Sequence, residues 1–173
     1  DLVQKMRDFA VTAGLTPSPF DCWMAERGLL TFDLRFERAQ QNAQALAAIL
    51  SRFSGVKQVL YPLRADHPNH QLASALLGQN GGNMVSFELT GGRAAANAFV
   101  QAADGLAFAP TLGDVGTTLS HPATSSHRAL TPEARHALGI SEGFFRVSVG
   151  LEPFSVLEAV FSTAIAVAAT ATA

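Results

Sequence analysis

Residues 143–152, GFFRVSVGLE, place one arginine inside a run of apolar and β-branched residues that is typical of a buried strand. A guanidinium keeps its proton in proteins, so Arg146 can be buried only where it meets an anion. Because side chains alternate along a strand, Arg146 and Ser148 share one face. The apolar residues of the run form the opposite face: Phe145, Val147 and Val149. The face of Arg146 is therefore mixed, with a small and polar end, as expected of a wall that lines a pocket.

Two kinds of anion could accept this guanidinium. An internal ion pair would use one of the acidic side chains that are near in sequence: Glu152, Asp114 or Glu142. A bound ligand would be a substrate carboxylate, whose two oxygens match the planar fork of an arginine. Strand context alone leaves both interpretations open.

The stretch 111–130, TLGDVGTTLSHPATSSHRAL, is dense in Gly, Ser, Thr, Asp and His for so apolar a chain. Loops of this composition often present backbone N–H groups to ligand oxygens. The alternative is an ordinary polar surface loop. The histidine pairs of the chain lack a cysteine or carboxylate at metal-site spacing, so no metal site is predicted.

Composition indicates an ordinary globular domain. The chain has 173 residues, of which 48% are hydrophobic and 15% charged, with a formal net charge of −2. This length suffices for one good core, and the charge gives no support for nucleic acid or a membrane as partner. The N-terminus lacks the pattern of a signal peptide, and the apolar C-terminal run is shorter than the roughly 20 residues that span a bilayer. With Cys22 as the single cysteine, we expect no internal disulfide and a cytoplasmic location.

Hydrophobic periodicity predicts helices and strands that alternate after a helical beginning. Helices are expected at residues 1–13, 21–32, 33–53, 67–78, 91–103, 131–139 and 153–168. Strands or extended runs are expected at residues 57–62, 83–89, 106–112 and 143–152. This order predicts an α/β domain in which helices pack on one sheet.

Five blocks, taken in order, resemble the Cys/Met-metabolism group of pyridoxal-phosphate (PLP) enzymes. This group contains cystathionine γ-synthase, cystathionine γ- and β-lyase, methionine γ-lyase and the O-acylhomoserine sulfhydrylases. The blocks are SPFDCWMAERGLLTFDLRFERAQQNAQALAAIL, VKQVLYPLRADHPNHQLA, NMVSFELTGG, TLGDVGTTLSHPATSSH and LTPEARHALGISEGFFRVSVGLE. They cover nearly the whole chain.

The resemblance implies the C-terminal part of a fold-type-I PLP enzyme, with helices on a small, mostly antiparallel sheet. Arg146 then matches the arginine that grips the α-carboxylate of an amino-acid substrate. Thr117 stands where the family usually has a serine, and would assist through its hydroxyl or backbone N–H. Ser126 is a further substrate-site candidate behind these two. The complete enzyme would be a homodimer or homotetramer.

The resemblance also implies what this chain lacks. The chemistry needs a lysine that binds PLP, yet only Lys5 and Lys57 occur, and neither has the family's Ser-x-Thr-Lys setting. We therefore expect no catalytic residue and no cofactor-binding residue in this portion. Residues 1–50 would connect from the cofactor-binding domain, and residues 51–173 would form the smaller C-terminal domain.

Two functions follow from these observations. In the first, the chain supplies the substrate-carboxylate site of an enzyme that forms or cleaves C–S bonds, by β/γ elimination or γ replacement on cysteine, methionine, cystathionine or O-acylhomoserine. In the second, it is a non-catalytic assembly or binding module. Lyase and synthase are not separated by these residues.

Overall fold

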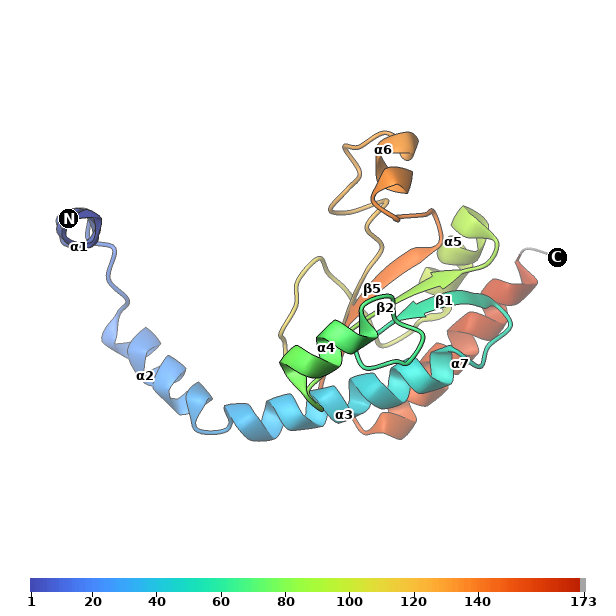
Figure 1. Ribbon diagram of the computed structural model, residues 1–173, viewed down its shortest axis with the longest axis horizontal. Helices are drawn as coiled ribbons and strands as arrows, with labels where there is room; N and C mark the ends of the chain where they lie inside the picture. The colour runs from blue at the N-terminus through green and yellow to red at the C-terminus, as the bar shows by residue number, and fades with distance from the viewer. Residues whose placement is uncertain (172–173) are drawn as a thin grey trace. The chain divides into compact units, whose positions relative to one another are not determined.

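The computed structural model describes residues 1–171 (Figure 1). The helices within this range are α1 (Leu2–Thr12), α2 (Pro19–Leu29), α3 (Phe32–Leu50), α4 (His70–Leu77), α5 (Gly92–Ala102), α6 (Pro132–Ala137) and α7 (Phe154–Thr170). The strands are β1 (Val56–Leu60), β2 (Met84–Leu89), β3 (Ala107–Phe108), β4 (Thr118–Ser120) and β5 (Phe144–Ser148). The chain forms two compact units, which divide between Leu34 and Arg35. The domain boundary expected at residue 50 stays a prediction about the complete enzyme.

The first unit consists of α1, α2 and the start of α3. Asp1 caps α1 by accepting a hydrogen bond from the N–H of Val3. Ser18 and Asp21 form a reciprocal capping box at the start of α2, where Pro19 occupies the first turn. Neither α1 nor α2 buries a residue. Their ends are therefore well defined, although no core holds them.

A five-stranded sheet organises the second unit. The strand order is β1-β2-β5-β4-β3, and only the β3–β4 pair is parallel. β5 lies at the centre, between β2 and β4. The expected α/β domain with a small, mostly antiparallel sheet is confirmed.

One face of the sheet carries the core, together with α5, α7 and the C-terminal part of α3 (Figure 1). The residues predicted for the apolar face of β5 are fully buried in it: Phe145, Val147 and Val149. At its centre, the ring of Phe87 stacks on that of Phe145 at 5.3 Å. Phe99 and Phe161 close the cluster from α5 and α7. Burial of each such side chain contributes about 1.5–3 kcal/mol, so this cluster anchors β5.

The stretch 111–130, expected to be a loop, contains a strand. Thr118–Ser120 form β4, which pairs with β5 and places Leu119 in the core. β4 fixes the middle of this stretch to the strand that carries Arg146. Among residues 1–171, no helix is long and apolar enough to cross a membrane.

Candidate functional site

Arg146 projects from the middle of β5 on the face opposite the core. Its register partners are Ser86 on β2 and Ser120 on β4, so a small hydroxyl residue lies on each side of it. The arginine is half-buried. Hydroxyl groups carry no charge, so neither serine neutralises the guanidinium. The setting suits the binding of an incoming anion.

The three carboxylates considered for an internal ion pair are each bonded elsewhere. Glu152 accepts hydrogen bonds from Thr117, and Glu142 forms salt bridges with Arg93 and Arg135. The carboxylate of Asp114 accepts the N–H of the next residue at 2.6 Å. Within residues 1–171, Arg146 makes no salt bridge with any of them. Among the described residues, this guanidinium therefore has no internal counter-ion.

Ser148 ties the preceding loop to the face of Arg146. Its hydroxyl oxygen accepts the N–H of Gly113 at 2.9 Å and the side-chain amide of Asn83 at 3.2 Å. The hydroxyl of Thr118 donates to the carbonyl of Thr111 at 3.2 Å. Because Ser148 is two residues beyond Arg146 on one face of a strand, these contacts hold the loop backbone beside the arginine.

Thr117 fastens the other end of this loop. Its N–H and its hydroxyl donate to the two carboxylate oxygens of Glu152, at 2.6 and 2.8 Å. The same hydroxyl oxygen accepts the N–H of Gly150 at 2.9 Å. Thr117 is buried. Both atoms that we expected to assist the clamp are thus occupied by Glu152 in this structure, and the residue's role toward substrate stays a prediction.

Gly150 and Asn42 complete the support of this loop, and neither was predicted as a site residue from the sequence. A Cβ on Gly150 would lie 2.5 Å from the carbonyl oxygen of Val115, so only glycine lets the loop approach the end of β5 so closely. The amide of Asn42, buried on α3, donates to the carbonyls of Gly150 and Glu152, each at 2.9 Å. In the sequence, the sign that Asn42 is buried was a polar amide within the otherwise apolar stripe of α3.

Ser126 is exposed, and its hydroxyl lies 2.9 Å from Nδ1 of the neighbouring His127. No hydrogen bond described for residues 1–171 joins it to Arg146 or Thr117. The structure therefore does not bring Ser126 into the network around Arg146, and its place in a substrate site stays a prediction.

His121 anchors the turn that contains Ser126. Its Nε2 lies 2.9 Å from the carbonyl oxygen of Glu142, which can only accept, so Nε2 carries the proton. Nδ1 lies 2.8 Å from the hydroxyl of Thr124. Burial, more than any charge, lowers the pKa of His121. A neutral imidazole thus holds the turn against β5. The pKa of Glu142 is also lowered, mainly by the hydrogen bond that its carboxylate accepts from Arg135.

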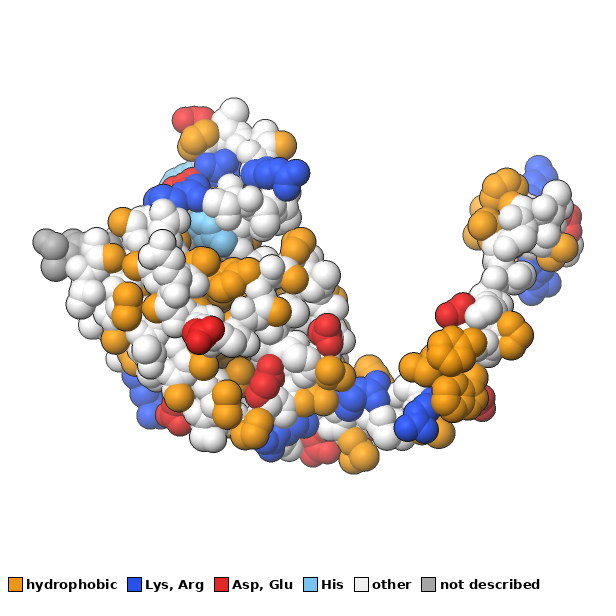
Figure 2. Space-filling model, turned by 180° about the vertical axis from the view of Figure 1, so that it is seen from behind, with side chains coloured by type: hydrophobic (Ala, Val, Ile, Leu, Met, Phe, Trp, Pro, Cys, Tyr) orange, Lys and Arg blue, Asp and Glu red, His pale blue; other side chains and the backbone are white. Residues whose placement is uncertain are grey.

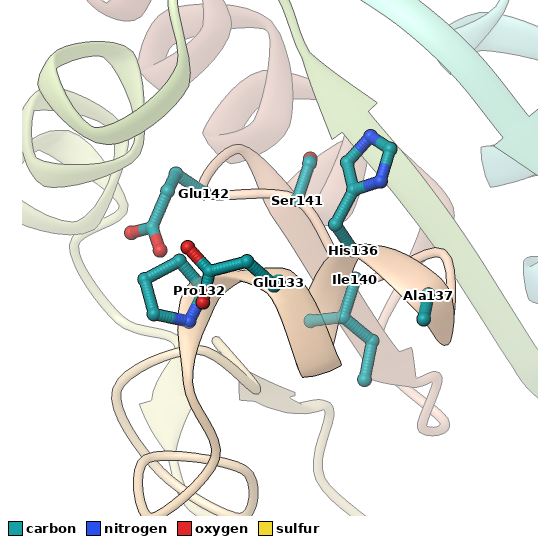
Figure 3. Close-up of a pocket in the computed structure, with 7 residues that line it drawn as sticks. All are labelled: Pro132, Glu133, His136, Ala137, Ile140, Ser141 and Glu142. Atoms are coloured by element: carbon teal, nitrogen blue, oxygen red, sulfur yellow. The ribbon is translucent and has the colours of Figure 1, made fainter.

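A pocket of about 500 Å³ lies beside α6 (Figure 3). Its walls come from α6 and the segment that leads into β5: Pro132, Glu133, His136, Ala137, Ile140, Ser141 and Glu142. None of the three predicted substrate residues lines it. No group of three or more His, Cys, Asp or Glu side chains in the described part of the chain could hold a metal ion.

Comparison with known proteins supplies the family. Residues 1–166 match the family described as Cys/Met metabolism PLP-dependent enzymes. The chain belongs to this family. It is 43% identical to the O-succinylhomoserine sulfhydrylase of Pseudomonas aeruginosa over 152 residues, which are 87% of this chain and 37% of the relative. It is 42% identical to the L-methionine gamma-lyase of Pseudomonas putida, over 80% of this chain and 35% of the relative.

The fold is shared with solved members of the family. The crystal structure of cystathionine gamma synthase from Xanthomonas oryzae pv. oryzae, in complex with aminoacrylate and cysteine, matches with a TM-score of 0.87 and 41% identity. The match covers 98% of this chain and 44% of that chain. The chain thus spans less than half the length of these Cys/Met-metabolism enzymes.

The family uses PLP, whose chemistry needs a lysine that binds it, and both lysines of this chain are exposed. The ammonium group of Lys57 is bonded to Glu88 at 2.9 Å, and its side chain is 63% exposed. Lys5 is exposed on α1. Neither lysine lies in a buried pocket of the kind that activates a nucleophilic lysine. The role of this chain toward the substrate and the cofactor stays a prediction.

Proposed function

We propose that this chain supplies the substrate-carboxylate site of a PLP-dependent enzyme that forms or cleaves C–S bonds in sulfur amino acids. One observation carries the proposal: Arg146 lies on the polar face of β5 and, among residues 1–171, forms no salt bridge with a carboxylate. Its planar fork would bind the two oxygens of an α-carboxylate side by side. The substrate would be an amino acid such as cysteine, methionine, cystathionine or an O-acylhomoserine.

The remaining residues position this clamp. Ser148 and Thr117 hold the loop 111–117 at the same end of β5, and Asn42 fixes the backbone that follows the strand. A well-tied frame lowers the entropy lost when the carboxylate binds. The bond-making chemistry would belong to the cofactor-binding portion of the family's chain.

The proposed reaction class is the formation or cleavage of C–S bonds, and no single reaction within it is proposed. Sulfhydrylase, methionine lyase and cystathionine synthase relatives lie at 43%, 42% and 37% identity, so similarity does not favour one strongly. We further propose a homodimer or homotetramer for the complete enzyme. The cytoplasmic location stays a prediction, based on the free Cys22.

The test is a titration of the chain, carrying isotope-labelled arginine, with L-methionine and with its decarboxylated amine. The guanidinium signal of Arg146, assigned by its loss in Arg146→Lys, should shift with L-methionine and stay in place with the amine. Exposed Arg128 provides the control signal, which should respond to neither compound. Equal responses to both compounds, or no response at Arg146, would overturn the proposal.

A further inference from the structure

A β-bulge brings the side chain of Lys57 to the face of the sheet that carries Arg146. The pairing of β1 with β2 shifts between Val56 and Gln58, so Lys57 is the extra residue of the bulge. Its ammonium group bonds to the carboxylate of Glu88 on β2, at 2.9 Å. Bulges re-aim side chains, and this one adds a second cation to a face that already has an arginine.

Glu88 lies on the same face of the sheet as Arg146. β2 pairs with β5 so that Ser86 is opposite Arg146 and Glu88 is opposite Phe144. Residues two positions apart on a strand share a face, and diagonal neighbours across two strands are within reach of long side chains. The side chain of Glu88 is only 12% exposed, and a carboxylate so far buried needs a partner. Glu88 is therefore a further candidate for an internal counter-ion of Arg146, one that is distant in sequence.

Lys57 and Arg146 flank Glu88 from opposite sides. In the strand order β1-β2-β5, the strand of Lys57 lies on one side of β2 and the strand of Arg146 on the other. The carboxylate bonds to Lys57 and, among residues 1–171, forms no salt bridge with Arg146. Lys57 thus holds Glu88 on the β1 side of its strand. Two cations and one carboxylate leave this face with one positive charge in excess.

A second cluster of two cations and one carboxylate, beside α6, shows the alternative arrangement. There the two oxygens of Glu142 bond to two guanidinium groups, those of Arg93 and Arg135. Figure 2 shows basic, acidic and histidine side chains gathered over this part of the molecule. A carboxylate of this chain is thus able to bind an arginine while it carries another cation. The separation of Glu88 from Arg146 therefore depends on the side to which Lys57 draws the carboxylate.

We propose that Lys57 is a positioning residue of the substrate-carboxylate site, because it keeps Glu88 from pairing with Arg146. A substrate carboxylate would then meet a guanidinium without an internal competitor, on a face with an excess of positive charge. Without the lysine, Glu88 would turn toward β5 and bind Arg146 in the place of the substrate. This inference rests on the proposed function of Arg146.

The first measurement uses the chain without a ligand, carrying isotope-labelled arginine. The guanidinium signal of Arg146 should move in Lys57→Gln, because Glu88 then pairs with it. The signal should return close to its wild-type position in the double variant Lys57→Gln with Glu88→Gln. The matched control, Lys5→Gln, makes the same change of charge at the exposed lysine of α1 and should leave the signal in place. An unmoved signal in Lys57→Gln, or a shift that persists in the double variant, would overturn the inference.

The second measurement titrates the same variants with L-methionine. Lys57→Gln should bind about threefold to tenfold more weakly than the wild type, because Glu88 competes and the excess positive charge is lost. The double variant removes the competitor and restores the excess charge, so its affinity should return to the wild-type value. Equal affinities of Lys57→Gln and the wild type would contradict the inference. If the wild type does not bind L-methionine, the proposed function fails, whereas the signal of the ligand-free chain still decides whether Lys57 keeps Glu88 from Arg146.

Discussion

The carboxylate of Glu152 accepts two hydrogen bonds from one residue, Thr117: one from its backbone N–H at 2.6 Å and one from its hydroxyl at 2.8 Å. Glu152 was one of the candidates for an internal ion pair with Arg146. In the described part of the chain Glu152 bonds to Thr117 and forms no salt bridge with Arg146. The pair also joins the loop 111–117 to the residues that follow β5.

Thr117→Val should destabilise the chain by about 1–3 kcal/mol. Valine keeps the shape of the side chain, but it removes the donor to Glu152 and the acceptor for the N–H of Gly150. Thr117→Ser keeps both hydrogen bonds and should cost less, about 1 kcal/mol for the lost methyl group. Urea unfolding of the three proteins measures the difference. Equal stabilities of the valine and serine variants would show that the hydroxyl contributes nothing.

Arg146→Gln should change the free energy of unfolding by less than about 1 kcal/mol, because Arg146 forms no salt bridge within the described range 1–171. Arg135→Gln is the matched comparison. Arg135 is buried and donates to Glu142 at 2.6 Å and to the carbonyl of Leu130 at 2.7 Å, so its loss should cost about 1.5–3 kcal/mol. Chemical denaturation of both variants checks the order. A larger loss at Arg146 than at Arg135 would indicate that Arg146 has an internal structural partner after all.

The stability of the chain should fall as the pH drops below about 6.5, in part through His121. Burial lowers the pKa of His121 in the folded protein, so the unfolded chain binds the proton more readily. Protonation therefore favours unfolding, by at most about 1.4 kcal/mol per pH unit from this group. His121→Gln should remove this contribution from urea titrations between pH 5 and 8, a range set by the ordinary histidine pKa of about 6.5. The control variant His136→Gln, at an exposed position, should keep this pH-dependent loss of stability. Identical pH profiles for the two variants would show that His121 does not cause it.

The chain alone should not form a specific adduct with PLP. Lys5 is exposed on α1, and Lys57 is exposed and bonded to Glu88, so borohydride reduction should leave only slow, scattered labelling. The visible spectrum and peptide mapping measure the outcome. A saturable visible band with one labelled lysine would mean that the chain carries its own cofactor site.

Much of the fold was predictable because periodicity and turn residues agree along the chain. The alternation in residues 143–152 correctly separated the buried face of Phe145 and Val147 from the face of Arg146. The strand β4 was missed because three residues, two of them hydroxyl-bearing, show no periodicity by themselves. Its strand character comes from pairing with β5, which is a tertiary effect.

The frame around Arg146 was only partly predictable. The density of hydroxyl residues identified residues 111–130 as a candidate loop, and this loop packs beside the strand of Arg146. The hydroxyl of Thr117 bonds to Gly150 and Glu152, and the backbone N–H of Gly113 bonds to Ser148. These partners lie 33–35 residues away, and no local pattern announces such contacts. Asn42 is 108 and 110 residues from the two carbonyls that it binds. Long-range hydrogen bonds of this kind become visible only in the folded chain.

The most direct test of the central claim is a crystal structure of this chain grown with L-methionine. We expect the carboxylate of the amino acid to lie within hydrogen-bond distance of two guanidinium nitrogens of Arg146, while Thr117 keeps both bonds to Glu152. A structure in which Arg146 turns to Glu152, Asp114 or Glu142, with the methionine elsewhere or absent, would contradict it.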